Sequence, residues 1–198
     1  MAKAMSGQKT VTPSAEGLAA SIKASKTRGL PPVEKWNPPF CGDIDMEIRR
    51  DGTWFYEGTP IGRPGLVKLF ASILIREGEK YFLVTPVEKV GIRVLDAPFI
   101  AVDFEVSGED RDQRLTFTTN LDDITVAGED MPLRFVRDAE TGEPSPYVSV
   151  RRNLEALIDR KSFYRLVDLG VHHKGMFGVW SGGVFFGIIP SDELPAEA

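Results

Sequence analysis

Three arginines stand where the chain could hold a negatively charged ligand. The turn 62–65 (Gly-Arg-Pro-Gly) precedes an apolar segment that we predict to be a helix, and Arg151 and Arg152 precede a second one. Backbone N–H groups at a helix start attract anions, and a guanidinium can clamp an anion bidentately. Pro64 removes one N–H, so an ordinary Gly/Pro turn is the alternative. If both helix starts face one cleft, Arg63, Arg151 and Arg152 would hold a polyanion such as a nucleotide.

A second cluster of polar residues lies in the turn after the first predicted helix. Thr85, Glu88 and Lys89 bring a hydroxyl, a carboxylate and an ammonium group together, and we predict that they form another wall of the site. Ordinary turn chemistry explains the same residues equally well. Trp54 or Tyr147 could supply an aromatic face for the ligand, although such side chains more often belong to a core or an interface.

No catalytic or metal-binding motif stands out. The chain has neither a GxxxxGK[ST] phosphate loop nor a GxGxxG fingerprint after a strand. His172 and His173 would point to opposite faces of a strand, so they cannot both bind one metal ion in regular geometry. Asp43, Asp45 and Glu47 could bind a divalent cation. However, the alternation of polar and apolar residues alone places them on the solvent-exposed face of a sheet. We therefore expect no catalytic residue, no metal and no cofactor.

The composition favours a globular protein and excludes several classes. The chain has 198 residues, 42% of them hydrophobic, and 12 phenylalanines, enough for a substantial core. Its net charge of −5 argues against general nucleic-acid binding. The single cysteine, Cys41, excludes an intramolecular disulfide and a cysteine-based zinc site. No apolar run approaches the ~20 residues of a membrane span, and residues 1–10 lack the apolar core of a secretory signal. We expect a cytoplasmic protein.

The first half of the chain predicts an N-terminal arm and one α+β unit. Residues 1–38 form the arm, with a disordered start (1–12), a helix from Ser14 to about Lys26, and a Pro-rich linker. Residues 39–97 form the unit. Its helix begins after Gly65, buries residues 66–75 on more than one side and ends at Gly78. Its predicted strands and turn are Asp43–Ile48, the hairpin turn Asp51-Gly52, Thr53–Tyr56, Tyr81–Val84 and Val87–Leu95.

The second half, residues 98–198, predicts a larger unit that echoes the first. We expect a helix over Arg151–Asp159, followed by a strand over Phe163–Val167. The other predicted strands are 99–106, 114–120, 124–126, 133–136 and a hairpin, 176–180 with 184–189, around Gly182-Gly183. Arg151 and Leu154 repeat Arg63 and Leu66 at a spacing of about 88 residues. We therefore predict two duplicated units, each a mostly antiparallel sheet with one central helix. The alternative is that the two sequence patterns resemble each other by chance.

Several long motifs resemble a known bacterial family. CGDIDMEIRRDGTWFYEGTPIGRPGLVKLF, YFLVTPVEKVGI, PYVSVRRNLEALIDRKSFYRLV and GVWSGGVFF are similar to the domain-of-unknown-function family numbered 1285, over roughly Leu30 to Ile189. The resemblance implies a duplicated two-domain core with a superficially pleckstrin-homology-like C-terminal half. It also implies a nucleotide-like ligand between the domains and a role in signal transduction, with no established enzyme activity.

The leading functional prediction is a non-catalytic protein that binds a small anionic or nucleotide-like ligand. Arg63, Arg151 and Arg152 would hold its charge, and Lys89 and Glu88 would add polar contacts. The alternative is a pleckstrin-homology-like protein-interaction module that uses its sheet edges and has no small-molecule ligand. An enzyme with an undetected site is the third possibility.

Overall fold

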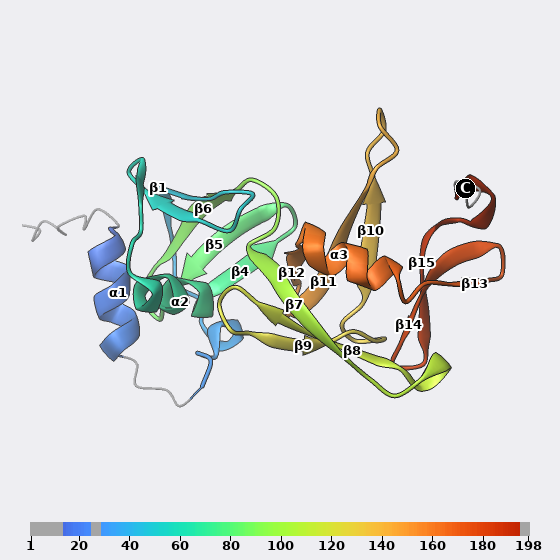
Figure 1. Ribbon diagram of the computed structural model, residues 1–198. Helices are drawn as coiled ribbons and strands as arrows, with labels where there is room; N and C mark the ends of the chain where they lie inside the picture. The colour runs from blue at the N-terminus through green and yellow to red at the C-terminus, as the bar shows by residue number, and fades with distance from the viewer. Residues whose placement is uncertain (1–13, 25–28, 195–198) are drawn as a thin grey trace, which may run out of the picture. The chain divides into compact units, whose positions relative to one another are not determined.

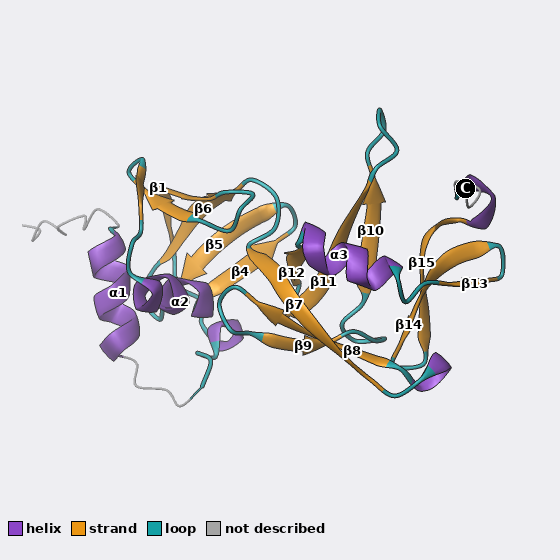
Figure 2. Cartoon of the chain, in the orientation of Figure 1, coloured by secondary structure: helices purple, strands orange, loops and turns teal. Residues whose placement is uncertain are grey.

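Strands dominate the structure of the protein, a computed structural model that describes residues 14–24 and 29–194 (Figure 2). The start of the arm (residues 1–12), predicted to be disordered, lies outside the described residues. The chain divides into two compact units: Met1–Glu47 with Phe55–Arg93, and Ile48–Trp54 with Val94–Ala198. No helix among the described residues is long and apolar enough to cross a bilayer.

The first unit is built on a six-stranded sheet with the order β3-β2-β1-β6-β5-β4 (Figure 1). Its elements are α1 (Ala15–Ala24), a 3-10 turn (Val33–Lys35), β1 (Phe40–Ile48), β2 (Trp54–Tyr56), β3 (Thr59–Pro60), α2 (Pro64–Ser72), β4 (Leu74–Glu77), β5 (Lys80–Val84) and β6 (Lys89–Val94). Met46 and Ile48 are fully buried, which confirms the predicted alternation in β1. Leu18 and Ile22 of α1 are buried too, and α1 packs against α2.

The helix of the first unit is shorter than predicted. It ends at Ser72, and Leu74–Glu77 form β4, which pairs with β5 and places Ile75 opposite Phe82. Ile73 and Leu74 are both fully buried, so the apolar run continues across the end of the helix into an edge strand of the sheet. A continuous apolar run does not distinguish a buried helix from a buried strand, which is why the prediction extended the helix too far.

The second unit contains another six-stranded sheet and a separate three-stranded one. The orders are β10-β11-β12-β7-β8-β9 and β13-β14-β15. The strands are β7 (Phe99–Ser107), β8 (Arg114–Thr119), β9 (Ile124–Val126), β10 (Leu133–Arg137), β11 (Pro144–Arg151), β12 (Leu154–Ile158), β13 (Val171–His173), β14 (Met176–Ser181) and β15 (Val184–Pro190), with α3 (Arg160–Val167) and 3-10 turns η2 (Asp110–Asp112) and η3 (Ser191–Glu193). Gly182 and Gly183 both have positive φ, which confirms the predicted hairpin.

The predicted helix and strand after Arg151 are wrong in both type and place. Residues 154–158 form β12, where Leu154, Ala156 and Ile158 are buried at alternate positions. The strand lies between β11 and β7, and this central position overrides the helix-like spacing of its leucines. The helix of this unit comes later, over Arg160–Val167, where a strand was expected. It starts at Asp159, whose carboxylate accepts a 2.8 Å hydrogen bond from the Ser162 N–H.

The two large sheets repeat one strand order, which confirms the duplication. Read from the other edge, the second sheet runs β9-β8-β7-β12-β11-β10 and matches β3-β2-β1-β6-β5-β4 strand for strand. β12 and β7 pair in parallel, while the neighbouring pairs are antiparallel. The repeat therefore aligns Phe40 with Phe99, at the starts of β1 and β7, and not Arg63 with Arg151. The helices are not equivalent, because α2 lies between β3 and β4 whereas α3 follows β12.

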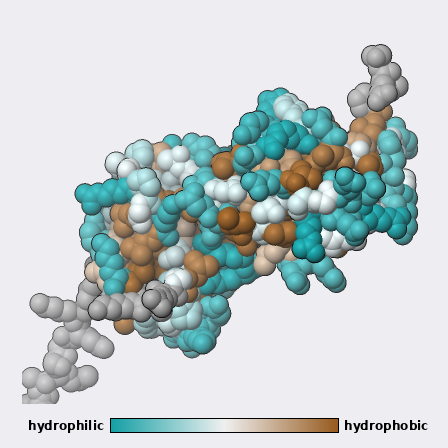
Figure 3. All heavy atoms as spheres, turned by 60° about the horizontal axis from the view of Figure 1, so that its bottom comes forward, coloured by the Kyte–Doolittle hydropathy of each residue, from teal (hydrophilic) through white to brown (hydrophobic). Residues whose placement is uncertain are grey.

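Some large apolar side chains stay on the surface of each unit. Figure 3 shows brown apolar groups interspersed with hydrophilic ones on the face it presents. The most exposed are Ile124 at 69%, Val87 at 65% and Phe40 at 57%. Scattered exposed apolar residues are normal for a protein surface, so these three do not by themselves mark a site.

Candidate functional site

Arg63 lies where the sequence predicts it, at the start of α2. It is the N-cap residue of the helix, its side chain is exposed, and no acidic residue occupies the first turn. Its carbonyl oxygen accepts hydrogen bonds from the N–H groups of Leu66 and Val67, at 2.9 and 3.2 Å. The guanidinium is therefore available to solvent at the positive end of a short helix.

The turn around Thr85 serves the fold of the first unit. Thr85 is fully buried, and its hydroxyl accepts hydrogen bonds from the N–H groups of Val87 and Glu88 at 3.3 and 3.1 Å. Burial raises the pKa of the Glu88 carboxyl. The Lys89 ammonium lies 2.6 Å from Glu77 and 4.4 Å from the centre of the Phe82 ring. The structure thus brings Thr85, Glu88 and Lys89 together, with internal partners for the hydroxyl and the ammonium.

Arg151 and Arg152 lie at the turn between two strands, so the predicted second helix start is wrong. Arg151 ends β11, and Arg152 adopts a left-handed backbone conformation with φ 52° before β12. The Arg151 guanidinium pairs with Asp123 and lies 4.7 Å from the centre of the Phe99 ring. Its side chain is only 11% exposed. An external anion would have to compete with this internal carboxylate.

Both predicted aromatic residues are core residues. Trp54 is 1% exposed and begins β2. Tyr147 is 9% exposed, and its hydroxyl donates a 2.8 Å hydrogen bond to Asp96. Burial, together with this bond to a carboxylate, raises the pKa of the Tyr147 phenol to about 12. The Arg134 guanidinium lies 4.3 Å from the centre of the same ring, so Tyr147 is enclosed by its own unit.

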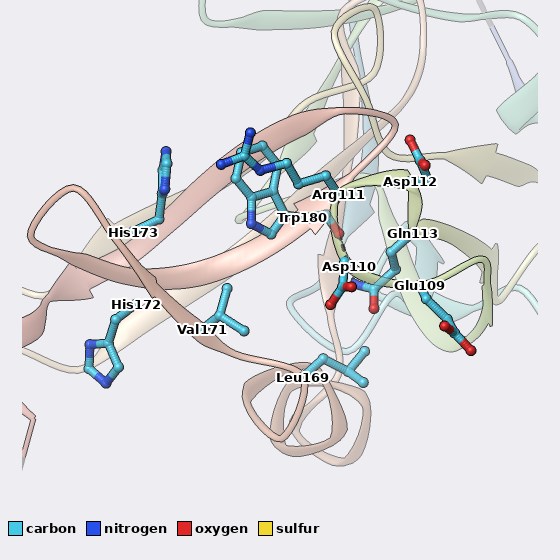
Figure 4. Close-up of a pocket in the computed structure, with 10 residues that line it drawn as sticks. All are labelled: Glu109, Asp110, Arg111, Asp112, Gln113, Leu169, Val171, His172, His173 and Trp180. Carbon is cyan, nitrogen blue, oxygen red and sulfur yellow. Dashed lines mark hydrogen bonds between the residues drawn. The ribbon is translucent and has the colours of Figure 1, made fainter.

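A site that the sequence did not indicate lies in the second unit, between η2 and the start of β13. It is a pocket of about 960 Å³ (Figure 4). Its lining consists of Glu109, Asp110, Arg111, Asp112, Gln113, Leu169, Val171, His172, His173 and Trp180. Two hydrogen bonds hold Gln113, the residue after η2, to the strand β14 and to the turn that follows it. The Gln113 side-chain amide donates to the Trp180 carbonyl at 2.9 Å, and the Gly182 N–H donates to the Gln113 carbonyl at 2.9 Å.

Aromatic rings form one wall of this pocket and continue beyond it. The ring of His173 lies 5.0 Å from those of Trp180 and Phe185, and the latter two are 5.3 Å apart. The Arg111 guanidinium lies 5.1 Å from the centre of the Trp180 ring. Figure 4 draws these two side chains next to each other. This distance is within the range of a cation–π contact, so the Trp180 face already holds a guanidinium group. All three rings are partly exposed to solvent.

Three carboxylates border the same pocket on the η2 side. Glu109, Asp110 and Asp112 are exposed, and across residues 14–24 and 29–194 no ion pair or hydrogen bond engages these side-chain oxygens. Asp110 has a positive φ of 50°, a conformation that aspartate tolerates better than most residues. Figure 4 shows Glu109 and Asp112 pointing outward and Asp110 between them and β13. With Arg111, the loop carries three negative charges and one positive charge.

The two histidines behave as strand alternation predicts. His172 and His173 point in opposite directions from β13 (Figure 4). The Nδ1 atom of His172 lies 2.8 Å from the Ser191 hydroxyl, whereas His173 joins the aromatic wall. Among the described residues no group of three or more His, Cys, Asp or Glu side chains could hold a metal ion. On the first unit, the Asp45 and Glu47 carboxylates lie 3.0 and 3.2 Å from Arg93.

The pocket combines segments that are far apart in the chain, which explains why sequence reasoning missed it. The hairpin of Trp180 and the charged turn at residues 108–113 are both visible in the sequence. Their contact rests on the bond from Gln113 to Trp180, across 67 positions of the chain. Neither the hydrophobic periodicity nor any sequence motif indicates that two such distant segments lie together. A tryptophan in a predicted hairpin was the one available signal, because large aromatics are enriched at recognition surfaces.

The matches to known proteins belong to one family. The model of the DUF1285 N-terminal domain, a domain of unknown function, matches residues 31–97, and that of the DUF1285 C-terminal domain, from a protein of unknown function, matches residues 98–188. A crystal structure at 2.50 Å resolution of a DUF1285 family protein from Silicibacter pomeroyi DSS-3 is 63% identical, with a TM-score of 0.84, and the match covers 89% of this chain and 97% of that one.

A second DUF1285 family crystal structure, from Shewanella baltica OS155, is 32% identical, has a TM-score of 0.49, and covers 62% of this chain and 90% of that one. No curated protein matches the chain. The two family models follow one another along most of the sequence, and the relative at 63% identity spans both. The chain therefore belongs to the DUF1285 family, as its sequence motifs indicated.

Proposed function

We propose that the protein is a non-catalytic interaction module, and that the pocket between η2 and β13 is where it recognises a partner protein. The observation that carries the proposal is the openness of the pocket. All ten residues that line it are exposed or half-buried. Sites for small molecules usually enclose most of the ligand surface between buried walls. A wide, open hollow suits one or two side chains that project from a larger partner.

The composition of the pocket supports recognition of a protein. Trp180 and Arg111 belong to the residue types that contribute most to binding energy at protein interfaces. Phe185 and His173 extend the aromatic surface next to Trp180. Val171, which is 43% exposed, adds an apolar rim. A compact aromatic centre with a polar margin is the usual anatomy of a recognition patch.

Site-specific photocrosslinking tests this proposal. A benzoylphenylalanine is placed at Val171 in the pocket or, as a control, at Val136 on β10, and both valines are 43% exposed. In cells that naturally make the protein, Val171 should yield one discrete crosslinked polypeptide that disappears in a Trp180→Ala background. Identical crosslinks at Val171 and Val136, or crosslinks that persist without Trp180, would reject the pocket as the recognition site.

The second candidate is the small anionic or nucleotide-like ligand, with a role in signal transduction, that the sequence predicts. One observation favours it, the exposed Arg63 at the N-terminus of α2 with no acidic residue in the first turn. Arg63→Ala should abolish a thermal shift caused by a nucleotide. Arg151→Ala is a poor test, because it also removes the internal pair with Asp123. If no nucleotide or phosphate compound shifts the melting temperature of the wild type, this candidate fails. The pleckstrin-homology-like character that the sequence resemblance implies for the C-terminal half would favour the first candidate, the protein-interaction module.

A further inference from the structure

We propose that the partner presents a cationic side chain, arginine or lysine, to the pocket, and that Arg111 occupies part of that site until the partner binds. The inference rests on the proposed function and specifies the chemistry of the partner. It combines three features of the pocket: the aromatic wall, the unengaged carboxylates and the internal guanidinium on Trp180.

The carboxylates of η2 contrast with four acidic groups of the same unit that are engaged by arginine. Asp96, Asp103, Asp123 and Glu155 each contact an arginine of the same unit. Glu109, Asp110 and Asp112 lie within four residues, and no such contact engages them in the described part of the chain. A positive charge that approaches the three carboxylates offsets their mutual repulsion. The loop therefore favours a cation over an anion.

The aromatic wall favours the same kind of group. Indole is the best of the aromatic side chains for binding a cation, and Arg111 already lies 5.1 Å from the centre of the Trp180 ring. Arg111 belongs to the same loop as the carboxylates. Because its guanidinium lies over the indole, it marks the position that an incoming cation would take. A partner arginine would compete with Arg111 for the indole and would gain the carboxylates in addition. Removal of Arg111 should therefore strengthen binding.

The experiment uses purified full-length protein and three probes: tetra-arginine, tetra-lysine and tetra-glutamate. Binding is followed by calorimetry at low and at physiological ionic strength. Tetra-arginine and tetra-lysine should bind and tetra-glutamate should not. Asp110→Asn, which keeps a side chain suited to the positive φ of 50°, should weaken tetra-arginine binding about fivefold. Arg111→Ala should strengthen it several-fold, and Trp180→Leu should weaken it.

Matched controls separate the pocket from general attraction to an acidic protein of net charge −5. Asp130→Asn removes one exposed carboxylate outside the pocket lining and should leave the affinity within twofold of the wild type. Three results would overturn the inference. They are equal losses of affinity in Asp110→Asn and Asp130→Asn, weaker tetra-arginine binding in Arg111→Ala, and preferential binding of tetra-glutamate. If Val171 crosslinks a Trp180-dependent partner while the cationic peptides do not bind, the proposed function stands and the cationic partner is wrong.

Discussion

Replacing Tyr147 by phenylalanine tests whether this residue belongs to the fold or to a ligand site. The Tyr147 hydroxyl donates a 2.8 Å hydrogen bond to Asp96, and the side chain is 9% exposed. A hydrogen bond to a charged group contributes about 1.5–3 kcal/mol to stability. Arg50 lies 3.7 Å from Asp96 and will partly compensate the carboxylate. We therefore expect Tyr147→Phe to lower the free energy of unfolding at neutral pH by about 1–2 kcal/mol.

The pH dependence provides a second and more specific readout. Burial first, and the bond to Asp96 second, raise the pKa of Tyr147 from 10.0 to about 12. Because the folded state keeps the phenol protonated to higher pH than the unfolded chain does, this stabilisation is fully present below pH 10. It falls as the pH rises and is lost above about 12. Two pKa units correspond to about 2.7 kcal/mol. The phenylalanine variant should lack this slope.

The assay is urea unfolding from pH 8 to pH 11.5, with titration of the phenolate absorbance in parallel. Tyr164→Phe is the matched control, because Tyr164 is 55% exposed and its hydroxyl accepts a hydrogen bond from Arg160 on the same helix. This control should change stability by less than about 0.5 kcal/mol. A Tyr147→Phe protein with wild-type stability and an unchanged phenolate titration would refute the structural assignment and return Tyr147 to the list of ligand-binding candidates.

Three further substitutions test the fold. Asp159→Ala should lower the free energy of unfolding by about 1 kcal/mol in urea, since it removes the cap of α3, whereas Asp159→Ser should restore most of it; equal losses would argue against a capping role. Gly178→Ala should lower the free energy of unfolding by about 1–3 kcal/mol, because the added Cβ would lie 2.1 Å from the Phe186 carbonyl oxygen. The control Gly128→Ala places its Cβ in open space and should leave the stability unchanged. Gly65 lies in the first turn of α2, and a Cβ added there would meet no other side chain or strand within 4 Å. Gly65→Ala should therefore raise the stability measured by thermal unfolding by about 0.5 kcal/mol, and a lower stability would show that the glycine is required there.

Most strands could be predicted from the sequence because one face of each strand is exposed to solvent. In β8, Leu115 and Phe117 are fully buried and alternate with threonines, as the prediction required. The errors fall where the apolar residues fit the spacing of a helix as well as that of a strand. β12 carries apolar residues at helical and at strand spacing alike, and only its position between β11 and β7 decides in favour of a strand. The edge strand β4 was assigned to a helix for the same reason, since the apolar run does not stop at Ser72.

The candidate site was less predictable than the fold. Reasoning from single arginines identified Arg63 correctly as a helix-start residue, but it placed Arg151 on a helix that does not exist. That error also shifted the internal repeat, because the true equivalence is between the starts of β1 and β7. The pocket beside Trp180 depends on contacts between η2 and β14, and hydrophobic patterning carries no information about such long-range pairs.

The most direct test of the proposed recognition site is to follow the three tryptophan indole N–H signals by nuclear magnetic resonance while a cationic peptide is added. Trp180 lines the pocket, whereas Trp54 is 1% exposed and serves as an internal reference. Tetra-arginine should shift the Trp180 signal progressively and leave the Trp54 signal in place, with the assignment made by Trp180→Phe. A Trp180 signal that stays in place while binding proceeds, or equal shifts of both signals, would contradict the account.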